Sequence, residues 1–291
     1  HMVIIGGGVI GVEMGSIFAR LGSQVSVVEF MDNIIPTMDK ELGSALKRSL
    51  SKIGMSFHVS TKVTAVTPGK TVHVTAESKQ GNPLELDCDV VLVAVGRRPY
   101  TDTLGLDKAG IKTDKRGFIQ IDKNFTTSAP NVFAIGDVVG GWQLAHKASE
   151  EGVACVELIH GEKPQLNYLT IPSVIYTWPE VASVGFTEAQ LKAENREFKK
   201  GKFPFKASGR ARAAEESEGF IKVLSDKNTD EILGIHMIGP RASDMITSGI
   251  IAMEFKASAE DIGAMMHPHP SYTEALKEAA LMASGNRAIH I

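Results

Sequence analysis

The sequence predicts an α/β fold, and three stretches of the chain carry that prediction. The first is an apolar strand-like run at residues 3–5, followed by a glycine turn, a helical pattern and a second strand-like run at residues 24–28. The second is a helical pattern over residues 39–54 that leads into several short strand-like runs. The third is an apolar run at residues 132–135 followed by a helical stretch that starts near Leu144. Strands that alternate with helices are typical of domains with a parallel sheet.

The composition describes an ordinary globular protein. A length of 291 residues leaves room for about two or three domains, and 43% of the residues are hydrophobic and 22% charged. The net charge of −3 gives no reason to expect a nucleic acid or an anionic membrane as a partner. The longest apolar run, residues 90–95, is far shorter than a transmembrane helix requires. We therefore expect neither nucleic acid nor membrane among the partners.

The glycine turn has the spacing Gly-x-Gly-x-x-Gly, in the run Gly6-Gly7-Gly8-Val9-Ile10-Gly11. The helical pattern that follows has apolar residues that approximate one face: Val9, Val12, Ile17, Phe18 and Leu21. Glycines at this spacing permit a tight turn, close approach of a pyrophosphate and close packing of helix on strand. The N-terminus of the helix would offer N–H groups and positive potential to phosphate. The pattern therefore predicts a dinucleotide site.

An acidic residue, Glu29, ends the second strand at about the twenty-residue spacing expected for this motif. A carboxylate there can bind a ribose 2′-hydroxyl, but it would repel the 2′-phosphate of NADP. The next three residues, Phe30, Met31 and Asp32, include no cation. We therefore expect NAD rather than NADP.

Residues 39–96 continue the alternation of helices and strands. Asp39 is expected to cap a helix that ends at Gly54 and carries apolar residues at helical spacing. Strands are expected at residues 56–59 and 62–66, a hairpin turn at residues 80–82, and a buried, central strand at residues 89–95. Gly96 follows that strand. A glycine at the carboxyl end of a central strand lets a ligand approach the backbone, although a plain turn explains it equally well.

The middle of the chain contains a second candidate site. Residues 101–125 are expected to be loops and short strands, and residues 132–135 a short strand that leads into Gly136 and Asp137. A carboxylate at a strand end can accept hydrogen bonds from a polyol chain, and the N-terminus of the following helix can stabilise negative charge on a bound ring. A Gly-Asp turn without a ligand is the alternative.

A histidine near the end of the chain stands between two prolines, in the run His267-Pro268-His269-Pro270-Ser271-Tyr272-Thr273-Glu274. Each proline fixes its own φ and favours extended geometry for the residue before it, so His269 lies on stiff backbone. One interpretation makes Ser271 a helix N-cap and Glu274 its capping-box partner. The other makes His269 a general base that Glu274 orients. The two candidate nucleotide sites, which need such a base, favour the second interpretation.

The two cysteines, Cys88 and Cys155, are far apart in the sequence and form no Cys-x-x-Cys. Neither a redox dithiol nor a zinc site is visible, and no other metal site is expected. Both cysteines are expected to be buried small hydrophobic residues in a reducing compartment.

Three separated motifs together resemble the flavoprotein disulfide reductases. They are the run from Gly6 to Glu13, the run Ala134-Ile135-Gly136-Asp137, and the run from His267 to Glu274. Supporting stretches lie at residues 95–99, 175–182 and 234–239, so the likeness covers essentially the whole chain. The His-x-His-Pro run and Glu29 resemble the branch that oxidises dihydrolipoamide more than the glutathione and mercuric reductases, which look like NADP enzymes.

The resemblance implies three parts and a set of site residues. The parts are a Rossmann-type NAD-binding domain at residues 1–100, a partial FAD-binding segment at residues 101–167, and a C-terminal α+β dimerisation domain at residues 168–291. The residues implied to contact NAD are Gly6, Gly7, Gly8, Val9, Ile10, Gly11, Val12, Glu13, Glu29, Val63 and Gly96. Asp137 would hold the FAD ribityl chain, and Gln143, Leu144, Ala145 and His146 would line the isoalloxazine ring. His269, oriented by Glu274, would accept a thiol proton in the site of the partner subunit.

The implied activity is the oxidation of dihydrolipoamide to lipoamide, with electrons passing through a disulfide and FAD to NAD⁺. The implied partners are a second copy of the chain in a homodimer, and the lipoyl domains and core components of 2-oxo-acid dehydrogenase complexes. The compartment would be the mitochondrial matrix in a eukaryote and the cytoplasm in a bacterium.

One departure from the family is severe. The family begins with an FAD-binding segment that carries its own Gly-x-Gly-x-x-Gly and a Cys-x-x-x-x-Cys redox pair, and this sequence contains neither. The chain is therefore expected to be a piece that starts at the first strand of the NAD domain, with an incomplete FAD site and no activity by itself. Two alternatives stay open: an NAD(H)-binding and dimerisation module, and a related NADH-dependent flavoprotein reductase or transhydrogenase.

Overall fold

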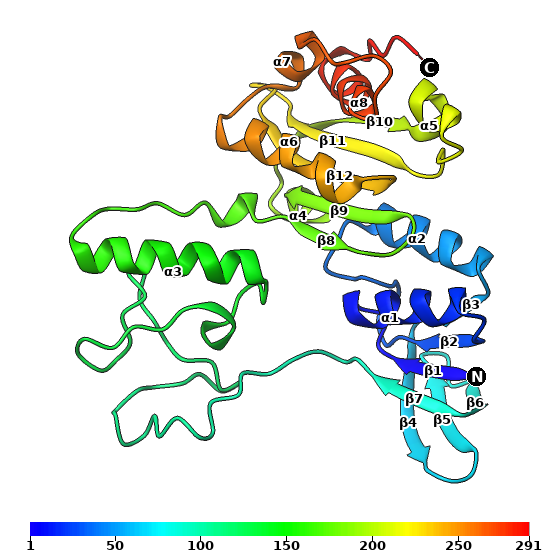
Figure 1. Cartoon of the computed structure of the whole chain (residues 1–291), viewed down its shortest axis with the longest axis vertical. Coiled ribbons are helices and arrows are strands. Elements are labelled where there is room, and N and C mark those ends of the chain that lie inside the picture. Colours follow the sequence, from blue (N-terminus) through cyan, green and yellow to red (C-terminus); the bar gives the residue numbers. More distant parts are fainter. Residues whose placement is uncertain (291) are drawn as a thin grey trace. The chain divides into compact units, whose positions relative to one another are not determined.

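The computed structural model describes residues 1–290 of the chain, which form two compact units (Figure 1). The larger unit combines residues 1–95 with the segment from Leu169 onward, and the smaller unit is Gly96–Tyr168. Helices accompany both parallel and antiparallel sheets, and the predicted α/β class is confirmed. Among residues 1–290, no helix combines the length and the apolar character needed to span a membrane.

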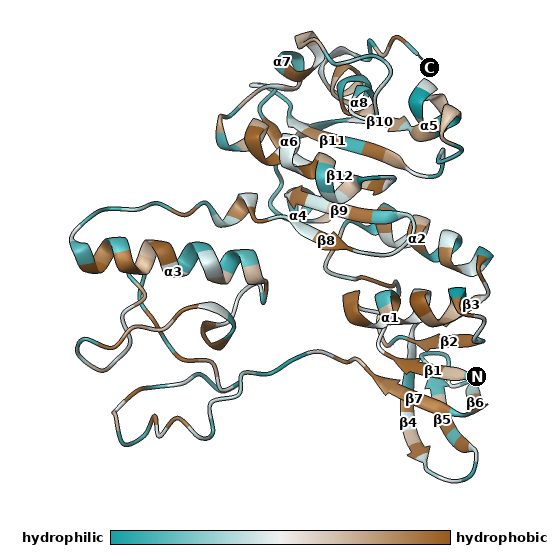
Figure 2. Ribbon diagram, viewed as in Figure 1, coloured by the Kyte–Doolittle hydropathy of each residue, from teal (hydrophilic) through white to brown (hydrophobic). Residues whose placement is uncertain are grey.

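A parallel sheet forms the first half of the larger unit, with the strand order β3-β2-β1-β7. Its strands are β1 (Met2–Ile5), β2 (Val25–Val28), β3 (Met55–His58) and β7 (Val90–Val93). In the register of the sheet, Ile4 of β1 is paired with Val27 of β2 on one side and with Leu92 of β7 on the other. Ile4 and Val27 are fully buried, and Figure 2 shows β2 and β7 as hydrophobic over most of their length. This arrangement is the Rossmann-type half-sheet that the alternating pattern predicted.

Helix α1 (Val9–Arg20) follows β1 as predicted, but it buries only part of the predicted face, with Val12 buried and Val9 and Phe18 packed against the core. Ile17 and Leu21 are 50% and 76% exposed, so the predicted apolar face is wrong at these positions. The buried residues are mostly small: Gly11, Val12, Gly15, Ser16 and Ala19. A Cβ atom on Gly15 would lie 2.5 Å from Cε of Met55 and 3.0 Å from Cδ1 of Ile4. Helix and sheet are so close that small residues line the contact, and a search for large apolar residues does not detect them.

Helix α2 (Lys40–Lys52) begins after Asp39, whose carboxylate accepts a hydrogen bond from N–H of Glu41 at 3.0 Å, as the predicted cap requires. The next strands are β4 (Thr61–Thr67), β5 (Val72–Ser78) and β6 (Pro83–Cys88), and they form a separate antiparallel sheet. The predicted turn at residues 80–82 joins β5 to β6, with Gly81 at φ +80°.

Strand β7 is not central, contrary to the prediction. It stands at the edge of the parallel sheet, next to β1, and it is shorter than the predicted range of residues 89–95. Val90 and Val93 are 47% and 63% exposed, so the interpretation as a buried strand is wrong. A run of valines is compatible with either position, because composition does not report whether a strand is paired on both sides.

The smaller unit contains a 3₁₀ helix, η1 (Gly136–Val139), and the helix α3 (Ala145–His160), which starts where it was predicted. The predicted strand at residues 132–135 does not form, since Phe133 makes only an isolated bridge to Thr126. A strand needs a neighbour along its length, and an apolar run alone does not supply one. Residues 101–125 are irregular apart from bridges such as Thr113 to Ile119.

The C-terminal half of the larger unit is built on an antiparallel sheet with the order β10-β11-β12-β9-β8. Its strands are β8 (Ser173–Ile175), β9 (Glu180–Gly185), β10 (Phe198–Pro204), β11 (Phe220–Asp226) and β12 (Ile232–Gly239). Its helices are α4 (Glu188–Ala193), α5 (Gly209–Ala213), α6 (Ala242–Glu254), α7 (Ala259–Ala264) and α8 (Glu274–Gly285), with a short 3₁₀ turn η3 (Phe205–Ala207). Another 3₁₀ turn, η2 (Tyr168–Thr170), begins at the last residue of the smaller unit. A buried cluster that includes Val184, Phe203, Val223, Ile235 and Leu276 forms its core.

The two halves of the larger unit share a hydrophobic core. Val181 and Phe220 from the C-terminal sheet belong to the same buried cluster as Leu42 of α2 and Ile4 of β1. Helix α2 therefore packs between the parallel sheet and the C-terminal sheet of this unit.

Candidate functional site

The glycine turn between β1 and α1 has no room for side chains at two of its positions. Gly6 has φ +106°, and a Cβ atom there would lie 2.4 Å from the carbonyl oxygen of Ala94. A Cβ atom on Gly11 would lie 2.0 Å from the carbonyl oxygen of Gly6. A Cβ atom on Gly8, the N-cap of α1, would meet no heavy atom of the described residues within 4 Å, so the turn is open on that side. The uncapped N–H groups of the first helical turn would suit a pyrophosphate there.

Glu29 lies at the end of β2, and its carboxylate faces the glycine turn. Oε2 accepts a hydrogen bond from N–H of Gly7 at 2.6 Å, and Oε1 accepts one from N–H of Met31 at 2.7 Å. Glu29 is only 8% exposed. The structure thus brings the acidic residue and the turn together. A fixed negative charge here disfavours a 2′-phosphate, whereas a carboxylate accepts a hydrogen bond from a 2′-hydroxyl.

Two lysines that the motif did not indicate lie beside the segment that follows Glu29. Nζ of Lys40 is 3.1 Å from Oδ2 of Asp32, and Nζ of Lys79 lies 5.5 Å from the centre of the Phe30 ring. The hydrogen bond from Lys40, followed by its charge, lowers the pKa of Asp32. Lys79 belongs to the turn between β5 and β6, so the order of residues after Glu29 gives no sign of it. Positively charged side chains therefore lie near the end of β2, but the charged group that is hydrogen-bonded to the glycine turn is Glu29.

Three other residues expected to contact NAD, namely Glu13, Val63 and Gly96, lie in different parts of the fold. Oε1 of Glu13, in α1, accepts a hydrogen bond from N–H of Tyr176 at 2.8 Å, which connects this helix to the C-terminal half. Val63, in β4, packs against an apolar cluster that joins the three-stranded sheet to the parallel sheet and includes Val74 and Val28. Gly96 begins the smaller unit and has φ +118°.

The segment around Asp137 forms the second candidate site, within the smaller unit. The Asp137 carboxylate forms an ion pair with Arg97, with Oδ2 and Nη2 2.9 Å apart. The four residues expected beside a flavin ring lie at the start of α3: Gln143, Leu144, Ala145 and His146. Leu144 is the N-cap of α3, and its side chain makes no capping hydrogen bond. The positive end of the helix dipole can stabilise negative charge there. A carboxylate that accepts hydrogen bonds and a helix N-terminus in one unit suit a ligand with both hydroxyl and anionic groups.

A buried ion pair fixes η1 against α3. The side chains of Lys147 and Glu151 are 4% and 3% exposed, with Nζ and Oε2 2.9 Å apart. Lys147 donates hydrogen bonds to the carbonyl oxygens of Gly136 and Gly140, at 3.3 and 3.0 Å, and Glu151 accepts one from N–H of Gly136 at 2.8 Å. Tyr168 donates to Glu151, and burial, followed by this bond, raises the pKa of Tyr168 to about 12. The i, i+4 spacing of Lys147 and Glu151 is the one sequence signal that could have indicated the pair.

His269 and Glu274 form a hydrogen-bonded pair at the start of α8. Nδ1 of His269 is 2.8 Å from Oε1 of Glu274. Because an ionised carboxylate only accepts hydrogen bonds, Nδ1 carries the proton of the neutral imidazole and Nε2 is the nitrogen that can accept one. The His269 side chain is 75% exposed, and that of Glu274 is 23% exposed. This is the geometry of a base and the residue that orients it.

Glu274 also makes the return bond of a capping box. Its Oε2 accepts a hydrogen bond from N–H of Ser271 at 2.8 Å. Ser271 is nevertheless not the N-cap, so that prediction is wrong: its hydroxyl lies 3.0 Å from the hydroxyl of Thr273, and Thr273 is the N-cap of α8. Burial acts to raise the pKa of Glu274, but the bonds from Ser271 and His269 outweigh it and lower that pKa.

Helix α8 packs on the C-terminal sheet and α1 lies on the parallel sheet, so His269 and the glycine turn are separate places in this chain (Figure 1). Nδ1 of His267 is 3.2 Å from the carbonyl oxygen of Met265, a contact that does not involve Glu274. Cys88 and Cys155 are free and buried, as expected, and burial raises the pKa of both thiols. A buried thiol of raised pKa is a poor nucleophile, so neither cysteine suits redox chemistry with His269.

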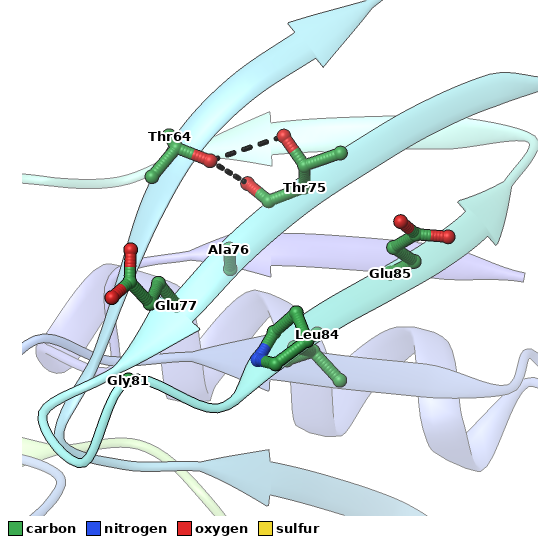
Figure 3. Close-up of a pocket in the computed structure, with 8 residues that line it drawn as sticks. Thr64, Thr75, Ala76, Glu77, Gly81, Leu84 and Glu85 are labelled. Carbon is green, nitrogen blue, oxygen red and sulfur yellow. Dashed lines mark hydrogen bonds between the residues drawn. The ribbon is translucent and has the colours of Figure 1, made fainter.

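A surface hollow of about 400 Å³ opens on the three-stranded sheet (Figure 3). Thr64 and Thr75 are hydrogen-bonded to each other in its wall, and its charged lining residues are the carboxylates Glu77 and Glu85. Two carboxylates would repel phosphate groups, so this hollow does not suit a dinucleotide.

Two protein-family models match the chain. The model described as pyridine nucleotide-disulphide oxidoreductase matches residues 1–152. The model for the dimerisation domain of the same proteins matches residues 171–280.

Curated relatives come from bacteria and plants. Dihydrolipoyl dehydrogenase 3 of Pseudomonas putida is 51% identical over 287 residues, which are 98% of this chain and 61% of that protein. The mitochondrial dihydrolipoyl dehydrogenase of Pisum sativum is 49% identical over 292 residues, 100% of this chain and 58% of that protein. Leghemoglobin reductase of Vigna unguiculata is 50% identical over 282 residues, 96% of this chain and 54% of that protein. The chain thus spans between 54% and 61% of the length of these relatives.

Solved structures share the fold at lower sequence identity. LpdA from Mycobacterium tuberculosis has a TM-score of 0.87 at 26% identity, over 96% of this chain and 61% of that one. The HOCl-induced flavoprotein disulfide reductase RclA from Escherichia coli has a TM-score of 0.88 at 28% identity, over 96% of this chain and 64% of that one.

Proposed function

The chain belongs to the pyridine nucleotide-disulphide oxidoreductases, and from that premise we propose that it is part of an enzyme that oxidises dihydrolipoamide with NAD⁺. The reaction converts dihydrolipoamide and NAD⁺ to lipoamide, NADH and a proton. Relatives named dihydrolipoyl dehydrogenase, near 50% identity over nearly the whole chain, support the proposal. The structural observation that carries it is the hydrogen-bonded pair of His269 and Glu274.

His269 is proposed as the base of this reaction. A thiol with a pKa of about 8.5 is mostly protonated at neutral pH, and only the thiolate attacks a disulfide efficiently. Nε2 of His269 would accept the thiol proton of dihydrolipoamide. Glu274 would hold the proton on Nδ1 and stabilise the imidazolium that forms. In a homodimer, which the match to the dimerisation model supports, His269 would act in the site of the partner subunit.

The remaining residues are proposed to hold the cofactors. The run Gly6 to Glu13, with Glu29, Val63 and Gly96, would bind NAD, and the open side of the turn at Gly8 suits its pyrophosphate. Asp137 and residues 143–146 would bind the ribityl chain and ring of FAD, with η1 fixed by Lys147 and Glu151. FAD, when bound, supplies the two-electron transfer between the disulfide and NAD⁺.

The proposed partners are the lipoyl domains and core components of 2-oxo-acid dehydrogenase complexes, because these present dihydrolipoamide to such an enzyme. The proposed compartment is the mitochondrial matrix or the bacterial cytoplasm, and both mitochondrial and bacterial proteins are among the relatives.

Two other functions have specific support. The buried cysteines favour an NAD(H)-binding and dimerisation module as the function of this chain on its own, because it supplies no redox pair. A relative named leghemoglobin reductase, at 50% identity, favours keeping an NADH-dependent reductase with another acceptor as an alternative.

The experiment that separates these functions is an assay of a holoenzyme in which the FAD-binding segment of the family precedes this chain. We expect NADH formation that requires both dihydrolipoamide and NAD⁺, and binding of NADH without turnover by the 291-residue chain. Rapid hydride exchange between nucleotides without any lipoamide-dependent reaction would contradict the proposal and favour a transhydrogenase. Turnover of dihydrolipoamide by the 291-residue chain would contradict the alternative that this chain on its own is an inactive NAD(H)-binding and dimerisation module.

A further inference from the structure

Lys222 is a fully buried lysine on β11 that joins the two halves of the larger unit. Its side chain is 0% exposed, and its Nζ is 2.5 Å from Oδ1 of Asp39 and 2.8 Å from Oε1 of Glu188. Asp39 is the N-cap of α2, in the first half, and Glu188 is the first residue of α4, in the C-terminal half. N–H of Glu188 also donates to Oδ2 of Asp39 at 3.3 Å. The lysine is therefore fixed between one carboxylate from each half.

Both carboxylates are held in their charged form. Burial acts to raise the pKa of Glu188, but the hydrogen bond and charge of Lys222, with those of Lys200, lower it to about 2. Burial acts on Asp39 in the same way, and the bond from Lys222 is the largest influence that lowers its pKa. Without Lys222, the buried carboxylate of Asp39 would lose the cation that bonds it and would face Glu188, which would keep Lys200 at 3.2 Å; leaving a buried charge without its partner is strongly destabilising.

The segment before Asp39 packs directly against the glycine turn. N–H of Ile35 donates to the carbonyl oxygen of Gly7 at 2.8 Å, and N–H of Met38 donates to the carbonyl oxygen of Ile35 at 3.0 Å. Ile34 is buried, and its Cγ2 would lie 3.1 Å from a Cβ atom on Gly7. A continuous set of bonded and packed groups thus leads from Lys222 through Asp39 and residues 34–38 to Gly7.

We propose that Lys222 is a positioning residue for the dinucleotide: through Asp39, the C-terminal half holds the glycine turn in its binding geometry. The proposal rests on the proposed role of that turn in binding NAD(H). Gly7 is also the residue whose N–H bonds Glu29. A shift of Asp39 would therefore move the turn and the carboxylate that selects the nucleotide together.

The test is calorimetric titration of the 291-residue chain with NADH, at a temperature where circular dichroism shows every variant folded. Lys222→Met keeps the length of the side chain and removes its charge. We expect the Kd for NADH to rise roughly ten- to a hundredfold, the scale on which supporting residues act at metal sites. Val223→Ala is the matched control, because Val223 is the next residue on β11 and lies in the C-terminal core. It should lower the stability through a cavity and leave the Kd unchanged.

Amide hydrogen exchange at Ile35 reports the position of the turn independently of the nucleotide. We expect faster exchange in Lys222→Met than in Val223→Ala. Adding Asp39→Asn to Lys222→Met keeps a helix cap and removes an unpaired charge, so it should recover part of the affinity. If Lys222→Met does not fold, Glu188→Gln weakens the same cluster at a position that is 15% exposed, and it should give a smaller rise in Kd.

The outcomes separate this inference from the proposed function. An unaltered chain that does not bind NADH would overturn the role of the glycine turn, and this inference with it. Suppose instead that the unaltered chain binds NADH, and that Lys222→Met and Glu188→Gln have the same Kd for NADH and the same exchange rate at Ile35 as Val223→Ala. Lys222 then only stabilises the fold. That result would overturn the inference and leave the nucleotide site intact.

Discussion

The carboxylate of Glu29 accepts a hydrogen bond from N–H of Gly7 at 2.6 Å, which joins the acidic end of β2 to the glycine turn. A second bond, from N–H of Met31 at 2.7 Å, fixes the other carboxylate oxygen. The negative charge is therefore held beside the place where a nucleotide ribose would lie. This relationship is the physical basis for expecting NAD rather than NADP.

Glu29→Gln tests this basis for nucleotide selection. Glutamine keeps the size and one acceptor oxygen but loses the charge that would repel a 2′-phosphate. We expect the preference for NADH over NADPH to fall by roughly tenfold, which corresponds to about 1.4 kcal/mol. Calorimetry with both nucleotides measures it. Lys79→Met, which removes the cation beside Phe30, is the opposite control and should increase the preference for NADH. An unchanged preference in Glu29→Gln would show that another group selects the nucleotide.

Lys147→Met tests how the Asp137 segment is held. The substitution leaves Glu151 buried without its cation and removes the hydrogen bonds to the carbonyl oxygens of Gly136 and Gly140. Breaking one side of a buried ion pair costs about 3–5 kcal/mol, so we expect the smaller unit to open more readily. Hydrogen exchange of the Gly136 amide, which donates to Glu151, should become much faster. Lys163→Met, at an exposed position of the same unit, should leave that exchange unchanged.

A buried histidine in the C-terminal sheet predicts a loss of stability in mild acid. Nε2 of His236 donates to the carbonyl oxygen of Phe186 at 2.9 Å, and Nδ1 is 2.6 Å from the hydroxyl of Ser183. Burial is the main cause that lowers the pKa of His236, from 6.5 to about 4. Between these two values the unfolded chain binds a proton that the folded chain does not. The free energy of unfolding should therefore fall as the pH falls through this window, by up to about 1.4 kcal/mol per pH unit.

His236→Gln should remove this pH dependence between about pH 6.5 and 5, because glutamine can still donate to Phe186 but does not titrate. Below about pH 5, carboxylates of lowered pKa such as Glu188 add their own loss of stability. Urea unfolding at several pH values measures it. His73→Gln, on the exposed side of β5, should leave the slope in place, since the bond to Asp87 raises rather than lowers the pKa of His73. A slope that survives in His236→Gln between about pH 6.5 and 5 would assign the acid sensitivity in that window to other groups.

Much of the fold was predictable because its signals are local. The turn from Gly6 to Gly11, the Asp39 cap and the start of α3 each depend on residues close in the sequence, and each lies where it was predicted. The proximity of His269 and Glu274 follows in the same way, because five positions and a helix start fix their distance.

The features that the sequence did not reveal depend on contacts between distant segments. The edge position of β7 depends on which strands pair, and the small-residue face of α1 depends on how closely that helix meets the sheet. The bond between Lys222 and Asp39 joins residues 183 positions apart. From the sequence alone, a lysine in a strand is expected to be exposed to solvent, so nothing indicates that Lys222 is buried. Lys147 and Glu151 have helical spacing, but the pattern does not say that they are buried.

The most direct test of the proposed chemistry compares two rates in the same holoenzyme. One is the formation of NADH from dihydrolipoamide, which requires a thiol proton to be removed; the other is the reduction of an artificial acceptor by NADH, which does not. We predict that His269→Ala lowers the first rate roughly a hundredfold or more, the scale of lost acid–base catalysis, and largely spares the second. Glu274→Gln should cost less, and His267→Ala, whose histidine contacts Met265 instead, least of all. Normal lipoamide turnover in His269→Ala, or a larger loss in His267→Ala, would contradict the assignment of His269 as the base.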